Sequence, residues 1–272
     1  MSYASIMVAV DDGRHARGRV RLAADLAHRF GARLVGVGAC MPEYPRVYGE
    51  TASPIDLIFD QIRLAALDRL ASTEQAFRNA SCLNERVTWR SALGFPARFL
   101  EQQARAADLV VLGRHAEDEG ADPTVTLAVG DALMGVGRPT LIVPPGIEHL
   151  EANRILIGWK NTPQTRRAVS DALPLLRRAA AVQVMQVAEG ADSAEVEDVV
   201  RFLALHDVHA RAHLAEPSGW TIADDLQGAA VGFGADLIVT GAYGYSRLRE
   251  WFFGGVTRDL LAGASVCCLM SH

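Results

Sequence analysis

The chain has 272 residues, half of them apolar, and a formal net charge of −5 from 27 basic and 32 acidic residues. This length and composition predict a folded protein with a sizeable core, and they argue against a nucleic-acid partner, which would call for a strongly basic surface. The chain enters an apolar run without a basic leader, and no uncharged apolar stretch approaches the ~20 residues of a membrane helix. We therefore expect a cytoplasmic protein that does not span a membrane.

Apolar runs of strand length alternate with helical patterns, and the alternation occurs twice along the chain. It predicts a parallel α/β architecture in each half. The corresponding runs are 6–12 and 155–161, 107–113 and 235–241, and 139–143 and 265–269. A long segment of the first half, residues 41–84, includes a helical pattern over 55–77 and has only a short counterpart in the second half. We therefore interpret the chain as an internal duplication in which one copy was extended or the other trimmed.

The connection between the halves, residues 144–153, begins Pro-Pro-Gly and continues with polar residues. Prolines and glycine end a strand, and polar residues suit a surface connection, so the sequence predicts domains at 1–146 and 152–272. An exposed apolar strand edge invites pairing. We therefore expect the last strands of the two domains, 140–143 and 266–269, to lie at a shared interface in an internal pseudo-dimer, which leaves a further homodimer open.

The segment GAYGYSRLREWFFGGVT, residues 241–257, follows an apolar strand run and precedes a helical one. Glycines at such a junction bring bare backbone N–H groups close to a ligand, and a helix N-terminus favours an anion. The spacing Gly-x2-Gly-x9-Gly before Gly-Val-Thr resembles the nucleotide motif of the universal stress protein family, and the resemblance of the two halves covers nearly the whole chain. The segment departs from that motif at Gly255, where nucleotide binders of the family usually carry a hydroxyl.

The resemblance implies two tandem Rossmann-like α/β domains of the adenine nucleotide alpha hydrolase type, each a five-stranded parallel sheet with helices on both faces. It also implies that the second domain holds ATP or ADP, with or without Mg²⁺. The residues implied to bind the nucleotide are Lys160, Val187, Thr240, Gly241, Gly244, Gly254, Gly255, Val256 and Thr257. Two alternatives stay open: Lys160 is equally a solvated surface lysine, and the glycines alone would make a tight strand-to-helix connection.

The first half has lost the motif. Asp11 matches the acidic residue that the family typically has at the end of the first strand, but Ala128 and Val129 replace the second glycine pair, and Asp131 replaces the threonine. Side chains at these positions would occupy the space that a phosphate needs, and a carboxylate would repel it. We therefore expect the first half to bind no triphosphate.

Two other clusters contain residues capable of chemistry. His206, His209 and His213 suggest zinc, but their spacing matches no standard ligand pattern and favours histidines at an edge strand, which we predict over 208–214. Near the chain start, Asp11, Asp12 and His15 suggest an acid and a base, but a turn followed by the start of a helix is the preferred interpretation. Since the sequence also lacks a nucleophile–base pair, we assign no catalytic residue and no metal site.

Cysteines and clustered aromatic residues add expectations about burial. Cys40, Cys82, Cys267 and Cys268 lack the spacing of a metal or redox motif, so we expect buried free thiols. The aromatic loop segment 44–48, with Tyr44, Pro45 and Tyr48, is a surface loop by default and alternatively covers a pocket or a partner groove. The run Trp251-Phe252-Phe253 is too apolar for water, so it should pack on the other domain, on its own domain or, as we prefer, on a protein partner.

These patterns favour a binding module that uses nucleotide occupancy as a regulatory signal in a stress response. A second hypothesis is an interaction scaffold without nucleotide, which Lys160 and Gly255 support. A third is a slow ATPase, which would need a carboxylate near the phosphates; Asp11 lies in the other half.

Overall fold

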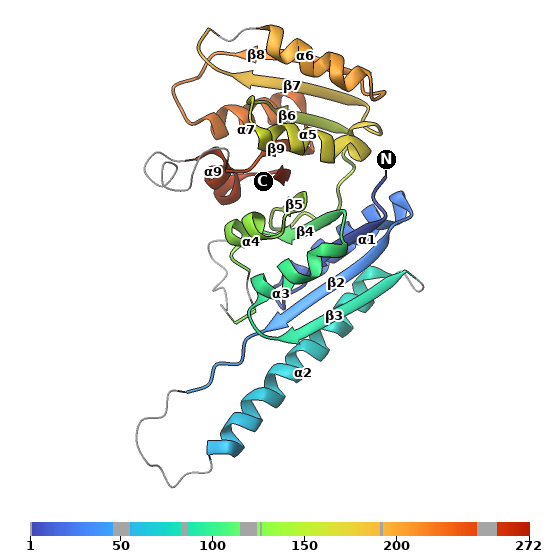
Figure 1. The fold of residues 1–272 in the computed structure, drawn as a ribbon, viewed down its shortest axis with the longest axis vertical. Coiled ribbons are helices and arrows are strands. Elements are labelled where there is room, and N and C mark those ends of the chain that lie inside the picture. Colours follow the sequence, from blue (N-terminus) through green and yellow to red (C-terminus); the bar gives the residue numbers. More distant parts are fainter. Residues whose placement is uncertain are drawn as a thin grey trace.

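A single mixed sheet runs through the whole molecule (Figure 1). The computed structural model describes residues 2–45, 55–82, 86–114, 124–125, 127–190, 193–243 and 255–272. In these residues the strands are β1 (Ser5–Ala9), β2 (Arg33–Cys40), β3 (Val87–Leu93), β4 (Leu109–Gly113), β5 (Thr140–Val143), β6 (Arg154–Gly158), β7 (Ala181–Val187), β8 (Ala210–Ala215), β9 (Leu237–Gly241) and β10 (Cys267–Ser271). Their order across the sheet is β3-β2-β1-β4-β5-β10-β9-β6-β7-β8.

Each half of the sheet has the same topology. The pairs β1–β2, β1–β4, β2–β3 and β4–β5 are parallel, and so are their counterparts β6–β7, β6–β9, β7–β8 and β9–β10. The central strands read as continuous apolar runs because both of their faces are covered. The predicted parallel α/β architecture, with five strands in each half, is confirmed.

The two halves join through their last strands. β5 and β10 pair antiparallel, with Leu141 opposite Leu269 and Ile142 opposite Cys268. An apolar edge that would otherwise be exposed in each half is covered by the other half. The prediction that residues 140–143 and 266–269 lie at a shared interface is confirmed.

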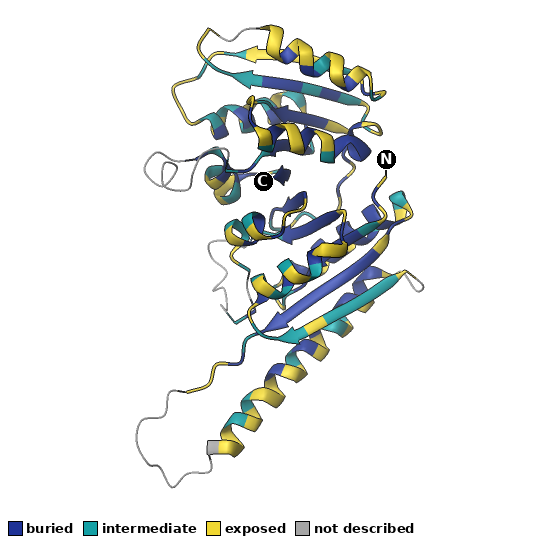
Figure 2. Cartoon of the chain, in the orientation of Figure 1, coloured by how far each residue is buried: buried dark blue, intermediate teal, exposed yellow. Residues whose placement is uncertain are grey.

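Helices cover both faces of the sheet, as expected. They are α1 (Ala16–Phe30), α2 (Ile55–Ser81), α3 (Pro96–Gln103), α4 (Val129–Gly135), α5 (Pro163–Leu176), α6 (Ser193–Ala204), α7 (Ile222–Phe233) and α9 (Val256–Gly263), with a 3-10 turn at Ala104–Ala106. Helices α1, α2, α5 and α6 pack with one apolar cluster, and α3, α4, α7 and α9 with the other. Figure 2 shows that the strands between them are mostly buried. Helix α2 ends at Ser81, beyond the predicted 77, and one end projects past the sheet (Figure 1).

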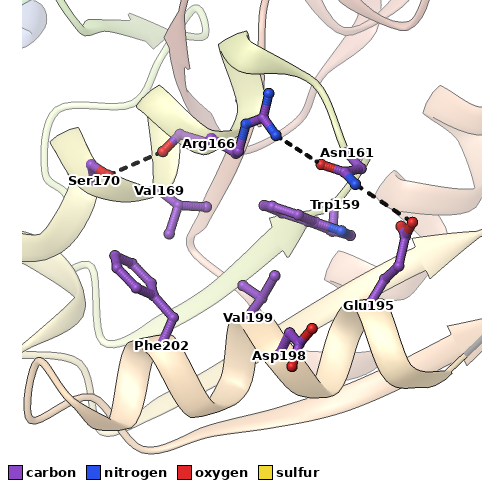
Figure 3. Close-up of a pocket in the computed structure, with 9 residues that line it drawn as sticks. All are labelled: Trp159, Asn161, Arg166, Val169, Ser170, Glu195, Asp198, Val199 and Phe202. Carbon is purple, nitrogen blue, oxygen red and sulfur yellow. Dashed lines mark hydrogen bonds between the residues drawn. The ribbon is translucent and has the colours of Figure 1, made fainter.

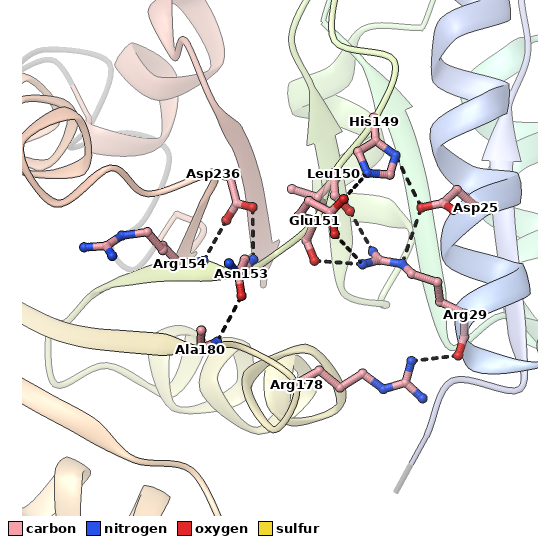
Figure 4. Close-up of polar contacts among 10 residues, drawn as sticks. All are labelled: Asp25, Arg29, His149, Leu150, Glu151, Asn153, Arg154, Arg178, Ala180 and Asp236. Carbon is pink, nitrogen blue, oxygen red and sulfur yellow. Dashed lines mark hydrogen bonds and ion pairs between the residues drawn. The ribbon is translucent and has the colours of Figure 1, made fainter.

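The connection between the halves is held by an arginine of α1 (Figure 4). The Arg29 guanidinium donates to the carbonyl oxygens of Leu150 and Glu151, each at 2.7 Å. Arg178, which follows α5, donates in turn to the Arg29 carbonyl at 2.7 Å. Leu150 and Ala152 are buried, so the expectation of a surface connection is wrong for these two residues. The predicted boundary nevertheless falls between the end of β5 and the start of β6.

The cysteines are free thiols, as predicted, but they are not all buried. Cys40, Cys267 and Cys268 are buried, whereas Cys82 at the end of α2 is exposed. Burial raises the pKa of Cys267 and the pKa of Cys268 to about 12, so both stay protonated at neutral pH. Across the residues that the structure describes, no helix has the length and apolar character to cross a membrane.

Candidate functional site

The candidate site begins where β6 and β9 end next to each other in the sheet. Residues of neighbouring parallel strands reach the same edge, which is where ligands bind in open α/β folds. Thr240, the penultimate residue of β9, is buried, and its hydroxyl donates to the carbonyl of Gly158 at the end of β6, at 3.3 Å. The Thr240 side chain therefore ties the two strand ends together.

Gly241 is required by the packing of α5. A Cβ atom at this position would lie 2.5 Å from the backbone nitrogen of Thr165 and 2.8 Å from its hydroxyl oxygen. The start of α5 is fixed there by a cap, since Thr165 N–H donates to the side chain of Thr162 at 3.2 Å. The close contact between α5 and the end of β9 thus accounts for the first glycine of the motif. At this one position, the structure favours the alternative in which the glycine serves close packing rather than nucleotide binding.

The start of α9 is the part of the site suited to an anion. Gly255 is the N-cap residue of this helix, and because it has no side chain it cannot accept a hydrogen bond from the first turn. Thr257 is buried, and its Oγ1 accepts the backbone N–H of Tyr243 at 3.0 Å. Backbone N–H groups and the positive end of the helix dipole therefore face this edge of the sheet without a side-chain cap.

The other implied residues lie around the same edge. Val187, Tyr243 and Val256 are half-buried, and each packs against the apolar cluster on the same face of the sheet. Lys160 is exposed in the loop between β6 and α5. Gly244 and Gly254 lie outside the described residues, and so does the run Trp251-Phe252-Phe253.

In the first half, an arginine covers the ends of β1 and β4. The guanidinium of Arg19, on α1, pairs with the Asp11 carboxylate at 2.7 Å and donates through Nε to the carbonyl of Ala9 at 3.0 Å. It also covers the end of β4, because a Cβ atom at Gly113 would lie 1.8 Å from Arg19 Nη1. The cavity beside Asp11 measures only about 10 Å³. The carboxylate that resembles the family's acidic residue is thus neutralised by its own chain.

The starts of α4 and α9 show that one predicted correspondence between the two halves, that of Asp131 with Thr257, is wrong. Helix α4 begins after the N-cap residue Ala128, as α9 begins after Gly255. Counted from these caps, the counterpart of Thr257 is Gly130 rather than Asp131. A Cβ atom at Gly130 would lie 2.8 Å from the hydroxyl of Tyr243, so the motif segment of the second half reaches the first turn of α4.

The structure also places the two clusters that had alternative interpretations. β8 lies at the edge of the sheet and holds His213, whereas His209 precedes its first residue, Ala210; the predicted strand began at 208. In the part of the chain that the structure describes, no group of three His, Cys, Asp or Glu side chains is arranged to hold a metal ion. His15 is the N-cap residue of α1, as expected. Tyr44 packs edge-on against Phe59 of α2, whereas Tyr48 lies outside the described residues.

Sequence reasoning missed Arg19 and Tyr243. Arg19 stands among small and apolar residues of α1, in the pattern Gly-Arg-Val, and is 4% exposed. A charged residue on the buried face of a predicted helix signals a buried partner, and Asp11 was the nearest candidate. Tyr243 lies inside the motif with a positive φ of 51°, but nothing in the sequence predicted its contact with Thr257.

Comparisons with known proteins agree with this fold. A model of the universal stress protein family matches residues 2–126. A crystal structure of a universal stress protein from Archaeoglobus fulgidus is 13% identical, with a TM-score of 0.70 over 98% of this chain and 95% of that one. A protein of unknown function from Pseudomonas aeruginosa is 15% identical, with a TM-score of 0.60 over 99% of this chain and 92% of that one.

Single-domain structures align with about half of the chain. A universal stress protein solved in complex with cAMP is 20% identical over 54% of this chain and 100% of that one, with a TM-score of 0.36. A search of curated proteins found no match.

Proposed function

We propose that the chain, whose residues 2–126 match a model of the universal stress protein family, binds ATP or ADP in its second half and uses occupancy as a regulatory signal. The phosphates would lie at the first turn of α9, with Lys160 adding positive charge from the end of β6 and Thr257 lining the phosphate end. Val187 would contact the nucleoside part.

One observation supports this placement above the others. At the start of α9 the N-cap residue is Gly255, which supplies no side-chain acceptor to the backbone N–H groups of the first turn. Helix α4 of the first half also begins without a side-chain cap, but there the end of β4 beside Asp11 is covered by Arg19. This difference supports placing the nucleotide in the second half.

An interaction scaffold without nucleotide is the competing function. It is favoured by Gly241, whose absent side chain is explained by the packing of Thr165 alone. Slow ATP hydrolysis is a smaller extension of the nucleotide proposal, since Asp11 is committed to Arg19 and lies in the other half. Measured affinity for ATP separates the nucleotide proposal from the scaffold.

Gly255→Asp should reduce ATP affinity far more than Gly255→Asn. Both side chains are good N-caps, and the backbone of Gly255, with φ −84° and ψ 139°, suits any residue, so both variants should fold. The aspartate adds a like charge at ~4 Å from the phosphate, which costs about 1–4 kcal/mol, or about 5-fold to several hundred-fold in affinity. Isothermal titration with ATP measures the difference, and circular dichroism checks the fold.

The neutral variant is the matched control, because it competes for the same N–H groups without the charge. Equal affinity of both variants and the unmodified chain would place the nucleotide elsewhere. Absence of ATP and ADP binding to the unmodified chain would leave the scaffold as the function.

A further inference from the structure

A cavity lined by arginines lies at the starts of β1, β2 and β3 in the first half. Its volume is about 380 Å³, which is within the range of roughly 300–1,000 Å³ found for small-molecule sites. In the order of the sheet, β4, β5 and β10 lie between β1 and β9, so this cavity is separate from the proposed nucleotide site. Its described lining consists of Ala4, Ser5, Gly31, Arg33, Val35, Arg86, Arg90 and Ala106. The charges among these residues are therefore all positive.

The three arginines lie close together on β2 and β3 because of the strand register. Leu34 is paired with Val87 across the two strands, which places Arg33 opposite Arg86, one residue earlier. Arg90 stands four residues after Arg86 and on the same face, since side chains alternate along a strand. Neighbouring strands are about 4.8 Å apart, and like charges opposite each other destabilise a sheet. An anion between Arg33 and Arg86 would relieve this repulsion.

Hydrogen bonds to neutral groups hold two of the guanidinium groups in place. Arg86 Nη1 donates to the carbonyl of Gly31, the C-cap residue of α1, at 2.8 Å. Arg90 Nη1 donates to Gln103 Oε1 at 3.0 Å. A guanidinium has several N–H donors, so each group keeps donors for a ligand. Asp108 accepts the backbone N–H groups of two lining residues, at 2.8 and 3.0 Å, but is not part of the described lining, so it does not balance the charge inside.

The second half holds different residues in the same place. By strand register, the positions equivalent to the three arginines hold Ala181, His209 and His213, in that order. Arg154, at the start of β6, is turned toward its own domain: its Nε donates to the carbonyl of Phe233 at 2.7 Å, and its guanidinium lies 4.6 Å from the centre of the Phe233 ring. The shared fold therefore does not require the arginines, and their cluster is a feature of the first half.

The cavity between α5 and α6, of about 390 Å³, offers a contrast (Figure 3). It is lined by Arg166 as well as by Glu195 and Asp198. Both signs of charge meet there, so its charge selects neither a cation nor an anion. The cavity at β1, β2 and β3 has one sign of charge in its described lining, which attracts anions.

Phosphate fits the arginine cavity better than carboxylate does. A carboxylate matches one guanidinium fork, whereas a phosphate group has three acceptor oxygens and more charge, so it can accept from Arg33 and Arg86 together. Arg90 is about 13 Å further along the strand, so its side chain would meet a second group of the same anion. The described lining has no aromatic side chain to stack on a base.

We propose that this cavity binds a small diphosphate anion, with one phosphate group between Arg33 and Arg86 and the other at Arg90. Inorganic pyrophosphate is the simplest anion of this class. The proposal does not depend on nucleotide binding at α9, and no covalent step is involved.

The test is isothermal titration of the full chain carrying Gly255→Asp with inorganic pyrophosphate, because that variant weakens the proposed phosphate site at α9. We expect saturable binding with a dissociation constant of about 1 mM or lower in about 0.1 M salt. Citrate, whose charge is on carboxylates, and inorganic phosphate should each bind at least about 10-fold more weakly. ADP should bind no more tightly than pyrophosphate. These results do not depend on whether the unmodified chain binds ATP.

Variants in the same background locate the anion. Arg33→Gln should weaken pyrophosphate binding about 10-fold or more, and Arg33→Lys, which keeps the charge but not the fork, should weaken it less. Arg33 is exposed, so both variants should fold, which circular dichroism checks. Arg211→Gln, at an exposed position of β8 in the other half, is the matched control: it removes the same charge and should leave binding unchanged. Absence of saturable binding, equal binding of citrate, tighter binding of ADP, or equal losses in Arg33→Gln and Arg211→Gln would each overturn the proposal.

Discussion

Asp11→Ala should lower the free energy of unfolding by about 3–5 kcal/mol, because it leaves the buried Arg19 guanidinium without its charge partner. The two side chains of the pair are 5% and 11% exposed, and their charged atoms are 2.7 Å apart. Denaturation in urea, followed by circular dichroism, measures the loss. This is the largest effect that we expect from a polar substitution in the first half.

Two variants separate the buried charge from the loss of a carboxylate as such. Asp12→Ala removes the ion pair between the neighbouring aspartate and Arg69. This pair is just as short, at 2.6 Å, but its two side chains are 30% and 45% exposed. That change should cost at most about 1 kcal/mol. The double variant Asp11→Ala/Arg19→Met removes both charges and should recover part of the loss. A double variant as unstable as Asp11→Ala would contradict the role of the buried Arg19–Asp11 ion pair. Equal losses of stability in Asp11→Ala and Asp12→Ala would contradict it as well.

Leu269→Ala should destabilise the whole chain by about 2–5 kcal/mol. Leu269 lies fully buried in β10, opposite Leu141 of β5, at the junction of the two halves. A smaller side chain there leaves a cavity in the one sheet that both halves share. Because the halves share that sheet, we expect a single cooperative unfolding transition that shifts to a lower urea concentration.

The control for this variant is Leu214→Ala in β8, a leucine that is 39% exposed at the edge of the sheet. Leu214→Ala should lower the free energy of unfolding by less than about 1 kcal/mol. Two separate transitions, with only one of them shifted by Leu269→Ala, would show that the halves unfold independently and that the junction is not continuous.

Buried central strands could be predicted from the sequence because both of their faces are apolar. The runs over β1, β4, β6 and β9 are continuous, and each was placed within three residues of its bounds. Edge strands give a weaker pattern, since one side of them meets water, and the start of β8 was accordingly misplaced. Helix α2 continues past its predicted end because Phe77 and Ala80 in its last turns pack into the apolar cluster on the sheet, a tertiary contact that the local pattern does not encode.

The candidate site was only partly predictable. The glycine motif identified the junction of β9 and α9, but the role of Gly241 depends on how α5 crosses it, which is a matter of packing. Gly113 and Gly241 occupy equivalent positions in the two halves, yet Arg19 covers Gly113 whereas Thr165 covers Gly241. The cavity between α5 and α6, which Trp159 lines, depends on how these two helices are placed, so no local pattern of the sequence predicts it.

The most direct test of nucleotide binding in the second half is a map of backbone amide resonances during titration of the ¹⁵N-labelled chain with ATP. The account predicts that the largest shifts occur at Val256, Thr257 and Tyr243, around the uncapped start of α9. Gly113 and its neighbour Arg114, at the filled end of β4, should keep their positions. Shifts that concentrate at Gly113 and Arg114 instead, or a spectrum that ATP leaves unchanged, would contradict it.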